Sequence, residues 1–373
     1  MNYPFLPYHT RLVMNRFLYL LPLLFFLACD DEEPGGGPNT VNFDRAAMLE
    51  SWADGAIIPA YTTLEASSET LATAASDFNA NPDATSLESL RQAYREAYVD
   101  YQAAAPFIIG KAEEIRYLEQ LSIYPSDVAQ IEENATTGTH NLDLPSAVDE
   151  QGFPALDYLL YGISEEELLN GSNAAAYRNY LIVLATRIHT LTGQVLTDWT
   201  DNGFREQFIS NSGNSATASV DRMVNDFIFY YEKHLRAGKV GIPAGVFSNA
   251  PLPDNAEAPY SGDFAKTLFT ASFTNVRNFF NGRFGGGIGL IDYLDALEVE
   301  RDGELLSGVI NDQFTQIEQQ LANVGDDFRN QVIDDNTEML RLYDELQKAV
   351  ILLKVDMLQA LNINVDFVDA DGD

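Results

Sequence analysis

Residues 152–162, which read Gly-Phe-Pro-Ala-Leu-Asp-Tyr-Leu-Leu-Tyr-Gly, contain the spacing in this chain that is most suggestive of chemistry. They have the frame of a G-x-H-x-x-E motif that begins at Gly152, with Pro154 at the histidine position and Asp157 at the glutamate position. Residues three apart on a helix share a face, so a histidine and a carboxylate at this spacing can hold one metal ion or share one proton. Pro154 has neither a titratable group nor an N–H. The segment therefore predicts the scaffold of a metal site that lacks half of its chemistry.

A group of charged residues lies upstream, in residues 111–127. It contains Glu113, Glu114 and Arg116, and it follows an apolar strip that ends in a glycine. An all-oxygen site for a hard cation, such as calcium or ferric iron, needs several converging carboxylates. Asp157 with Glu113 or Glu114 would supply them. The alternative is a solvated helix face with ion pairs between residues three apart.

Histidines are few. His140 lies in a polar loop, and His189 lies on an amphipathic stretch where a hydrogen-bonded packing role is expected. His234 follows two tyrosines and is expected to cap a helix end, where a cation is favoured. None has a second histidine within helical reach, so the sequence does not predict a His-rich zinc site.

The elements that must position these residues are helices. Apolar residues recur at spacings of three and four in residues 87–101, 177–195 and 340–358, whereas strand-like alternation is hard to find. Residues 241–262 contain four prolines and are expected to be irregular. The sequence predicts an all-α fold of two helical-bundle domains, residues 44–202 and 203–373, with a cleft between them.

The two halves contain a short internal echo. Gly152-x-x-x-x-Asp157-Tyr-Leu matches Gly287-x-x-x-x-Asp292-Tyr-Leu. If it reflects a duplication, the paired motifs are expected near the cleft between the bundles. Asp292 is for this reason a candidate ligand-binding residue.

The N-terminal segment indicates a cell-envelope protein. Twelve largely apolar residues, 17–28, follow Arg16 and precede Cys29. This run is shorter than the roughly 20 residues that cross a bilayer as a helix, and it has the features of a secretory signal. Residues 26–29 resemble a bacterial lipobox, in which the cysteine becomes lipidated. We therefore predict a signal peptide at residues 1–28 and an acidic, Gly/Pro-rich tether at residues 29–43, anchored through Cys29.

Charge excludes one class of partner. Cleavage before Cys29 would remove two of the 22 basic residues and none of the 56 acidic ones, leaving a formal charge of −36. Because phosphate neutralisation needs Lys and Arg patches, no nucleic acid is expected to bind. The single cysteine excludes a disulfide and a Cys-based metal site.

Several landmarks in order along the chain resemble the imelysin family. These are Tyr124-Pro125 at the family's Trp-Pro pair, the block 152–162, Lys239-Val240-Gly241, Tyr260-Ser261-Gly262, the segment 289–294 and the closing residues 367–373. The resemblance implies two helical-bundle domains, a lipoprotein or periplasmic setting, and an association with iron uptake or regulation. We expect an outer-membrane lipoprotein that faces the periplasm or the cell surface. Only the glycine of the family's presumed metal motif is kept, at Gly152.

The resemblance and the missing histidine together favour a non-catalytic protein that binds a small ligand, with iron or haem suspected and the cation otherwise open. The candidate ligand-binding residues are Gly152, Pro154, Asp157, Glu113, Glu114, Arg116 and Asp292, with Asp157 and Glu113 as metal ligands. One alternative is a metallopeptidase that uses His140 and acidic neighbours. Another is a surface scaffold or adhesion protein.

Overall fold

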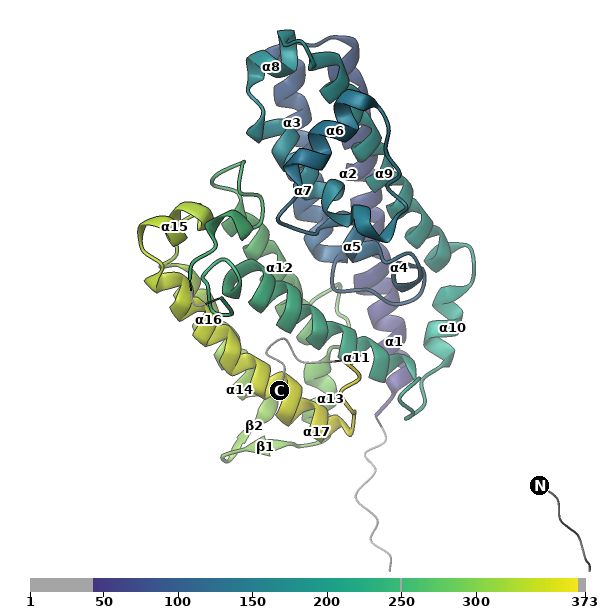
Figure 1. The fold of residues 1–373 in the computed structure, drawn as a ribbon. Coiled ribbons are helices and arrows are strands. Elements are labelled where there is room, and N and C mark those ends of the chain that lie inside the picture. The colour runs from purple at the N-terminus through teal and green to yellow at the C-terminus, as the bar shows by residue number, and fades with distance from the viewer. Residues whose placement is uncertain (1–42, 249, 368–373) are drawn as a thin grey trace, which may run out of the picture. The chain divides into compact units, whose positions relative to one another are not determined.

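Three long helices form the first half of the described chain. The structure is a computed structural model that describes residues 43–248 and 250–367. α2, Ile58–Ala80, packs along α3, Ala84–Ala104, and α9, Ala174–Thr200 (Figure 1). The predicted signal peptide, Cys29 and almost all of the predicted tether lie outside the described residues, as does the acidic tail from residue 368.

The apolar stripes account for this packing. Leu87, Leu90, Tyr94 and Tyr98 on α3 are all fully buried. They recur at helical spacing, so that one face of α3 is covered while the other stays in water. The other elements of this half are α1 Arg45–Ser51, η1 Trp52–Ile57, α4 Lys111–Glu114, α5 Tyr117–Leu121, α6 Val128–Thr137, η2 Pro145–Glu150, α7 Gly152–Asp157, η3 Tyr158–Gly162 and α8 Glu165–Asn170.

The second half is also helical. One continuous helix, α11 followed by η4, packs against α16 and α12. The elements of this half are α10 Phe204–Ser210, α11 Ser219–Phe229, η4 Tyr230–Gly241, η5 Pro253–Asn255, α12 Ala265–Phe280, α13 Leu290–Ala296, β1 Glu300–Arg301, β2 Glu304–Leu305, α14 Leu306–Leu321, α15 Phe328–Asp334, α16 Thr337–Val350, η6 Ile351–Met357 and α17 Leu358–Leu361.

The all-α prediction is confirmed, with one small addition. Strands β1 and β2 form a two-residue antiparallel hairpin. Asp302 and Gly303 at its turn both have positive φ, which is the geometry of a tight hairpin turn. Among the described residues, no helix combines the length and the apolar character needed to cross a membrane.

A connected set of buried apolar residues extends through both halves. The division into domains at residue 202 therefore stays a prediction. The two matching segments have different local structures. Asp157 ends α7, whereas Asp292 lies in the first turn of α13. His234 lies inside η4, and the expectation that it caps a helix end is wrong.

Candidate ligand-binding site

The motif at residues 152–157 forms α7, and all six of its residues are buried. Gly152 has φ +73°, and a Cβ placed on it would lie 2.3 Å from the carbonyl oxygen of Leu121. Both facts demand glycine, since other residues rarely adopt this φ and the neighbour is backbone. Pro154 lies within the first turn of α7, where a missing N–H costs no hydrogen bond. The motif is thus held tightly against α5.

Asp157 has no solvent-exposed surface. Its carboxylate accepts a hydrogen bond from the backbone N–H of Tyr260 at 2.9 Å and one from the Tyr94 hydroxyl at 3.3 Å. Burial raises the pKa of Asp157 to about 6, and these hydrogen bonds, with others from Ser261, oppose the rise. Asp157 therefore joins α7 to α3 and to the irregular segment that follows η5.

That segment carries a second buried carboxylate, Glu257. It accepts a hydrogen bond from the Tyr98 hydroxyl at 2.9 Å and forms an ion pair with Lys239 of η4. Lys239 also donates to the Gln102 side-chain oxygen at 3.0 Å. Burial lowers the pKa of Lys239, while Glu257 opposes the change. A buried ion pair with this many hydrogen bonds is costly to build, and such groups cluster at functional sites.

A small, partly open cavity of about 20 Å³ lies beside this ion pair. Its volume is that of about one water molecule. Residues from both halves of the chain line it: Tyr101, Gln102, Ala105, Leu118, Ser122 and Tyr124 before residue 202, and Tyr230, His234, Lys239 and Glu257 after it. The sequence predicts a site between the halves, and this cavity is supplied by both.

Two side chains of η4, Tyr230 and His234, line the cavity. The Tyr230 hydroxyl is buried, and no hydrogen bond of normal geometry reaches it from the described residues. Burial raises the pKa of Tyr230, and the nearby Ser272 hydroxyl lowers it by less. The ring of His234 stacks on that of Tyr230, with 5.8 Å between centroids. Burial, with Lys239 and Lys233 nearby, lowers the pKa of His234 to about 4, so this imidazole is neutral at pH 7.

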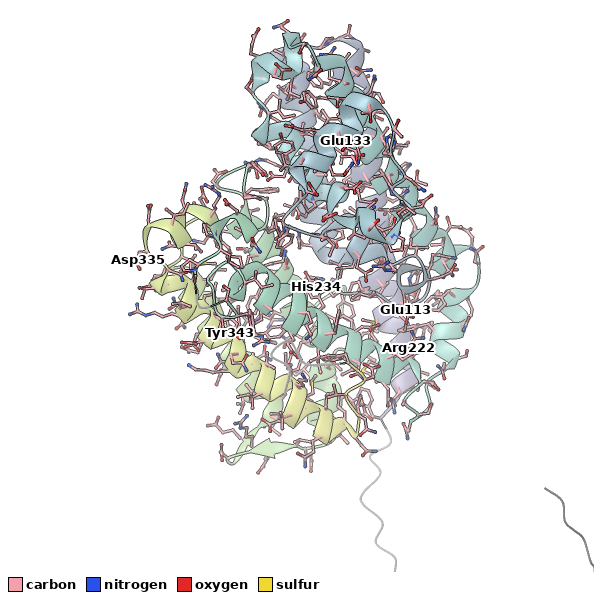
Figure 2. All side chains as sticks on the ribbon, in the orientation of Figure 1. Glu113, Glu133, Arg222, His234, Asp335 and Tyr343 are labelled. Atoms are coloured by element: carbon pink, nitrogen blue, oxygen red, sulfur yellow. The ribbon has the colours of Figure 1, made fainter. Side chains whose placement is uncertain are left out.

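Glu113, Glu114 and Arg116 lie on the surface instead. Glu113 pairs with Arg222 of α11, and the two side chains lie next to one another in Figure 2. Glu114 pairs with Lys111 at 2.7 Å, and Arg116 lies 3.6 Å from Glu119. These contacts match the solvated alternative that the sequence left open. The structure does not bring the three residues into contact with Asp157.

Asp292 has a local role, because its carboxylate accepts a hydrogen bond from the Gly289 N–H at 2.7 Å and caps α13. Residues 43–248 and 250–367 contain no group of three or more His, Cys, Asp or Glu side chains arranged to hold a metal ion. Metal binding by Asp157 with Glu113 therefore stays a prediction without an assembled ligand set. Any metal at the buried cavity would need other donors, such as tyrosine.

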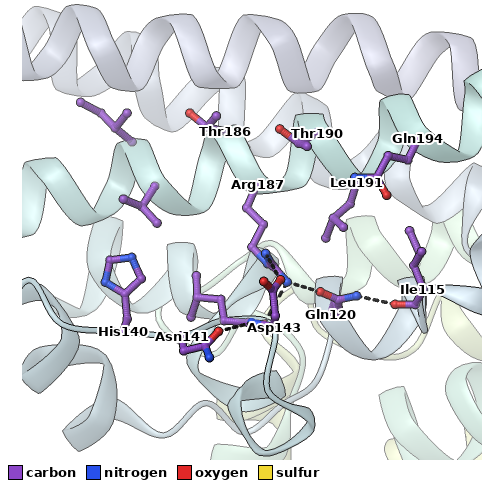
Figure 3. Close-up of a pocket in the computed structure, with 13 residues that line it drawn as sticks. Ile115, Gln120, His140, Asn141, Asp143, Thr186, Arg187, Thr190, Leu191 and Gln194 are labelled. Atoms are coloured by element: carbon purple, nitrogen blue, oxygen red, sulfur yellow. Dashed lines mark hydrogen bonds and ion pairs between the residues drawn. The ribbon is translucent and has the colours of Figure 1, made fainter.

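A larger open groove of about 680 Å³ follows the outer face of α9 (Figure 3). Arg187 crosses it and donates to Gln151 Oε1 at 2.6 Å and to the Leu142 carbonyl at 2.9 Å. Its third nitrogen pairs with Asp143 at 2.9 Å. His140 lies at one end, 5.4 Å from the Tyr180 ring centroid. Asp143, which also lines the groove, pairs with Arg187, and the metallopeptidase alternative that uses His140 stays a prediction.

The comparison with protein families decides what kind of chain this is. The family model described as Imelysin matches residues 57–354, which is more than half of the chain. The chain belongs to the imelysin family.

Solved structures agree in fold. An imelysin-like protein from Psychrobacter arcticum superposes with a TM-score of 0.68 at 17% identity, covering 87% of this chain and 97% of that one. A protein of Parabacteroides distasonis, provisionally named an iron-regulated protein A precursor, gives a TM-score of 0.70 at 16% identity and the same coverages. At such identities the likeness shows the shared fold alone.

One curated relative is similar in sequence. It is iron-regulated protein A of Synechococcus elongatus, 23% identical over 151 residues. The match covers 40% of this imelysin-family chain and 39% of the relative, so the two are aligned over less than half of their lengths.

Sequence reasoning missed Lys239 and Glu257 as site residues. A signal was present, because two of the landmarks that resemble the imelysin family are Lys239-Val240-Gly241 and Tyr260-Ser261-Gly262. The first contains the buried lysine, and the second holds the N–H that Asp157 binds. Glu257 had no comparable signal, since it is one of 56 acidic residues.

Proposed function

We propose that this protein is a lipid-anchored cell-envelope binding protein that captures iron for uptake and does not hydrolyse peptides. The observation that carries the proposal is the small cavity beside Lys239 and Glu257. Its lining combines a buried ion pair, phenol groups and a neutral imidazole, and residues from both halves of the chain supply them.

The size of the cavity favours an ion over a larger ligand. About 20 Å³ accommodates one water molecule or a bare ion. Drug-sized ligands occupy pockets of about 300–1,000 Å³, so haem would need the site to open. A peptide bond does not fit either, and Pro154 provides no ligand for a hydrolytic metal with its activated water.

The link to iron comes from the relatives. One curated relative and one structural neighbour carry the name iron-regulated protein A. Outer-membrane anchoring rests on the sequence around Cys29. A lipid-anchored iron-binding protein is consistent with both.

Calorimetry on the full chain tests this function. Ferric citrate, calcium chloride, zinc chloride and haemin are titrated into wild-type protein and into Glu257→Gln. We expect ferric iron to bind wild type, and Glu257→Gln to weaken it at least about tenfold, as loss of a metal-site group commonly does. No binding of any of the four ligands, or peptide cleavage that a chelator abolishes, would overturn the proposal.

A further inference from the structure

We infer that the open groove along α9 binds the carboxylate of an N-acylated amino acid, with Arg187 as its anchor. This group occurs at the C-terminus of a peptide and in free N-acyl amino acids. The groove has a volume of about 680 Å³, within the range of about 300–1,000 Å³ that is usual for small-ligand pockets. The inference goes beyond the proposed function, because the groove shares no lining residue with the cavity beside Lys239 and Glu257.

The first argument is that neutral groups hold Arg187 in place. Its Nε donates to Gln151 Oε1 at 2.6 Å, and its Nη2 donates to the Leu142 carbonyl at 2.9 Å and to the Gln120 side-chain oxygen. Gln151 is itself 1% exposed, and its amide group donates to the Leu142 and Ala147 carbonyls at 2.8 and 3.0 Å. None of these acceptors carries a charge, so they orient the guanidinium without neutralising it.

The second argument is that the counter-charge of Arg187 can leave. Arg187 Nη1 pairs with Asp143 at 2.9 Å, and the Asp143 side chain is 83% exposed (Figure 3). Such a carboxylate returns to water at little cost, since exposed ion pairs are weak. Among the lining residues, which all belong to the described part of the chain, Arg187 is the only lysine or arginine. A ligand with one carboxylate therefore suits the groove better than one with several.

The third argument concerns the apolar walls of the groove. Val183 and Leu191 lie four residues before and after Arg187 on α9, so all three share one helix face. Ile182 adds a further apolar side chain on the Val183 side. A ligand whose carboxylate lies between two apolar arms matches this arrangement. In an N-acylated amino acid, the carboxylate is attached to the α-carbon, between the side chain and the acylated nitrogen.

The fourth argument is a row of polar side chains along the same helix. Thr186, Thr190 and Gln194 are exposed and line the groove. They recur every four residues and extend over about 12 Å of helix. Their hydroxyl and amide groups can pair with the N–H and the carbonyl of an amide-linked ligand. Because a fatty acid has no such groups, the row favours an N-acylated amino acid.

The test is isothermal titration calorimetry of the full chain with N-acetyl-alanyl-leucine and with N-octanoyl-leucine, each compared with its C-terminal amide. We expect both acids to bind, and the amides to bind at least about tenfold more weakly, because they lose a charge-assisted hydrogen bond. Arg187→Gln should weaken the binding of the acids by a similar factor. Tighter binding of the dipeptide would identify a peptide end as the ligand, and tighter binding of the octanoyl compound a free N-acyl amino acid.

Asp143→Asn tests the same anchor without altering it. We expect this variant to bind the acids about two- to fivefold more tightly than wild type, because the ligand no longer competes with an exposed ion pair. Glu133→Gln is the matched control. It also removes one exposed acidic charge, from α6, but Glu133 does not line the groove.

Three results would each overturn the inference: no binding of either acid to wild type, equal binding of acids and amides, or equal affinity of Asp143→Asn and Glu133→Gln. Circular dichroism checks that Arg187→Gln is folded, and the other two comparisons do not depend on that variant. Iron binding is measured separately with Glu257→Gln, so failure at the groove and failure of the proposed function are distinguishable.

Discussion

The carboxylate of Asp157 accepts a hydrogen bond from the backbone N–H of Tyr260, 103 residues further along the chain, at 2.9 Å. This contact fixes the segment after η5 against α7. The same segment carries Glu257, so the motif residue positions the buried ion pair without touching the cavity itself. Asp157 is thus placed as a support for the site.

This support has a cost that depends on pH. A pKa raised from 3.8 to about 6 means that ionised Asp157 destabilises the fold by about 3 kcal/mol relative to the protonated form. Because the folded-state pKa is raised, the stability that Asp157 contributes is complete below about pH 4 and is lost as the pH rises through 6. We expect Asp157→Asn to gain about 3 kcal/mol relative to wild type between pH 4 and pH 7.5, measured by urea unfolding.

Asp83 provides a control of opposite sign. Hydrogen bonds from Ser86 lower the pKa of this exposed helix cap. Its contribution is therefore lost as the pH falls, and Asp83→Asn should gain relative to wild type toward acid pH. A difference between Asp157→Asn and wild type that stays flat with pH would show that Asp157 is not buried as described.

Gly152 sets the position of α7. We expect Gly152→Ala to lose about 3 kcal/mol or more, because a left-handed φ costs about 1–2 kcal/mol and overpacking against the Leu121 carbonyl adds about 1–3 kcal/mol. Gly138→Ala is the matched control, since Gly138 has φ +65° but nothing within 4 Å of its Cβ position. It should lose only about 1–2 kcal/mol in urea unfolding. Equal losses in the two variants would contradict the close approach at Gly152.

Lys239 and Glu257 should be strongly coupled. Lys239→Met leaves a buried carboxylate without its partner, which commonly costs about 3–5 kcal/mol. The double variant Lys239→Met/Glu257→Gln removes both charges and should be more stable than Lys239→Met alone. A double-mutant cycle by urea unfolding at pH 7 measures this coupling.

An exposed ion pair provides a comparison for the stability losses in that cycle. Lys348 pairs with Glu345 at 2.7 Å on the surface of α16, so Lys348→Met should lose less than about 1 kcal/mol. If Lys239→Met were no worse than Lys348→Met, the interior pair would be far more hydrated than its 4% and 2% exposed side chains indicate.

The fold was predictable because apolar spacing is a local signal. Residues 87–101 and 177–195 repeat at three and four, and they form α3 and α9. The irregularity of residues 241–262 was also local, since prolines remove backbone donors. What these patterns do not encode is which distant residues meet.

The site depends on contacts between residues that lie far apart in the sequence. Glu113 and Glu257 are equally acidic in the sequence, yet one pairs with Arg222 at the surface and the other with Lys239 in the interior. Asp157 was found because it occupies a motif position, whereas its partner is a backbone N–H that no residue type identifies. Tertiary packing alone decides which carboxylates become buried.

The proposed membrane anchor is Cys29, which lies outside the described residues. We expect wild-type protein expressed in a bacterial envelope to sediment with membranes and to enter the detergent phase, because two or more acyl chains give stable attachment. Cys29→Ser removes the only thiol that can be acylated, and this variant should stay in the aqueous phase. Asp31→Asn is the control: it alters the acidic run but keeps the cysteine, so it should stay in the membrane fraction. Membrane retention of Cys29→Ser would mean that the apolar run itself, uncleaved, is the anchor.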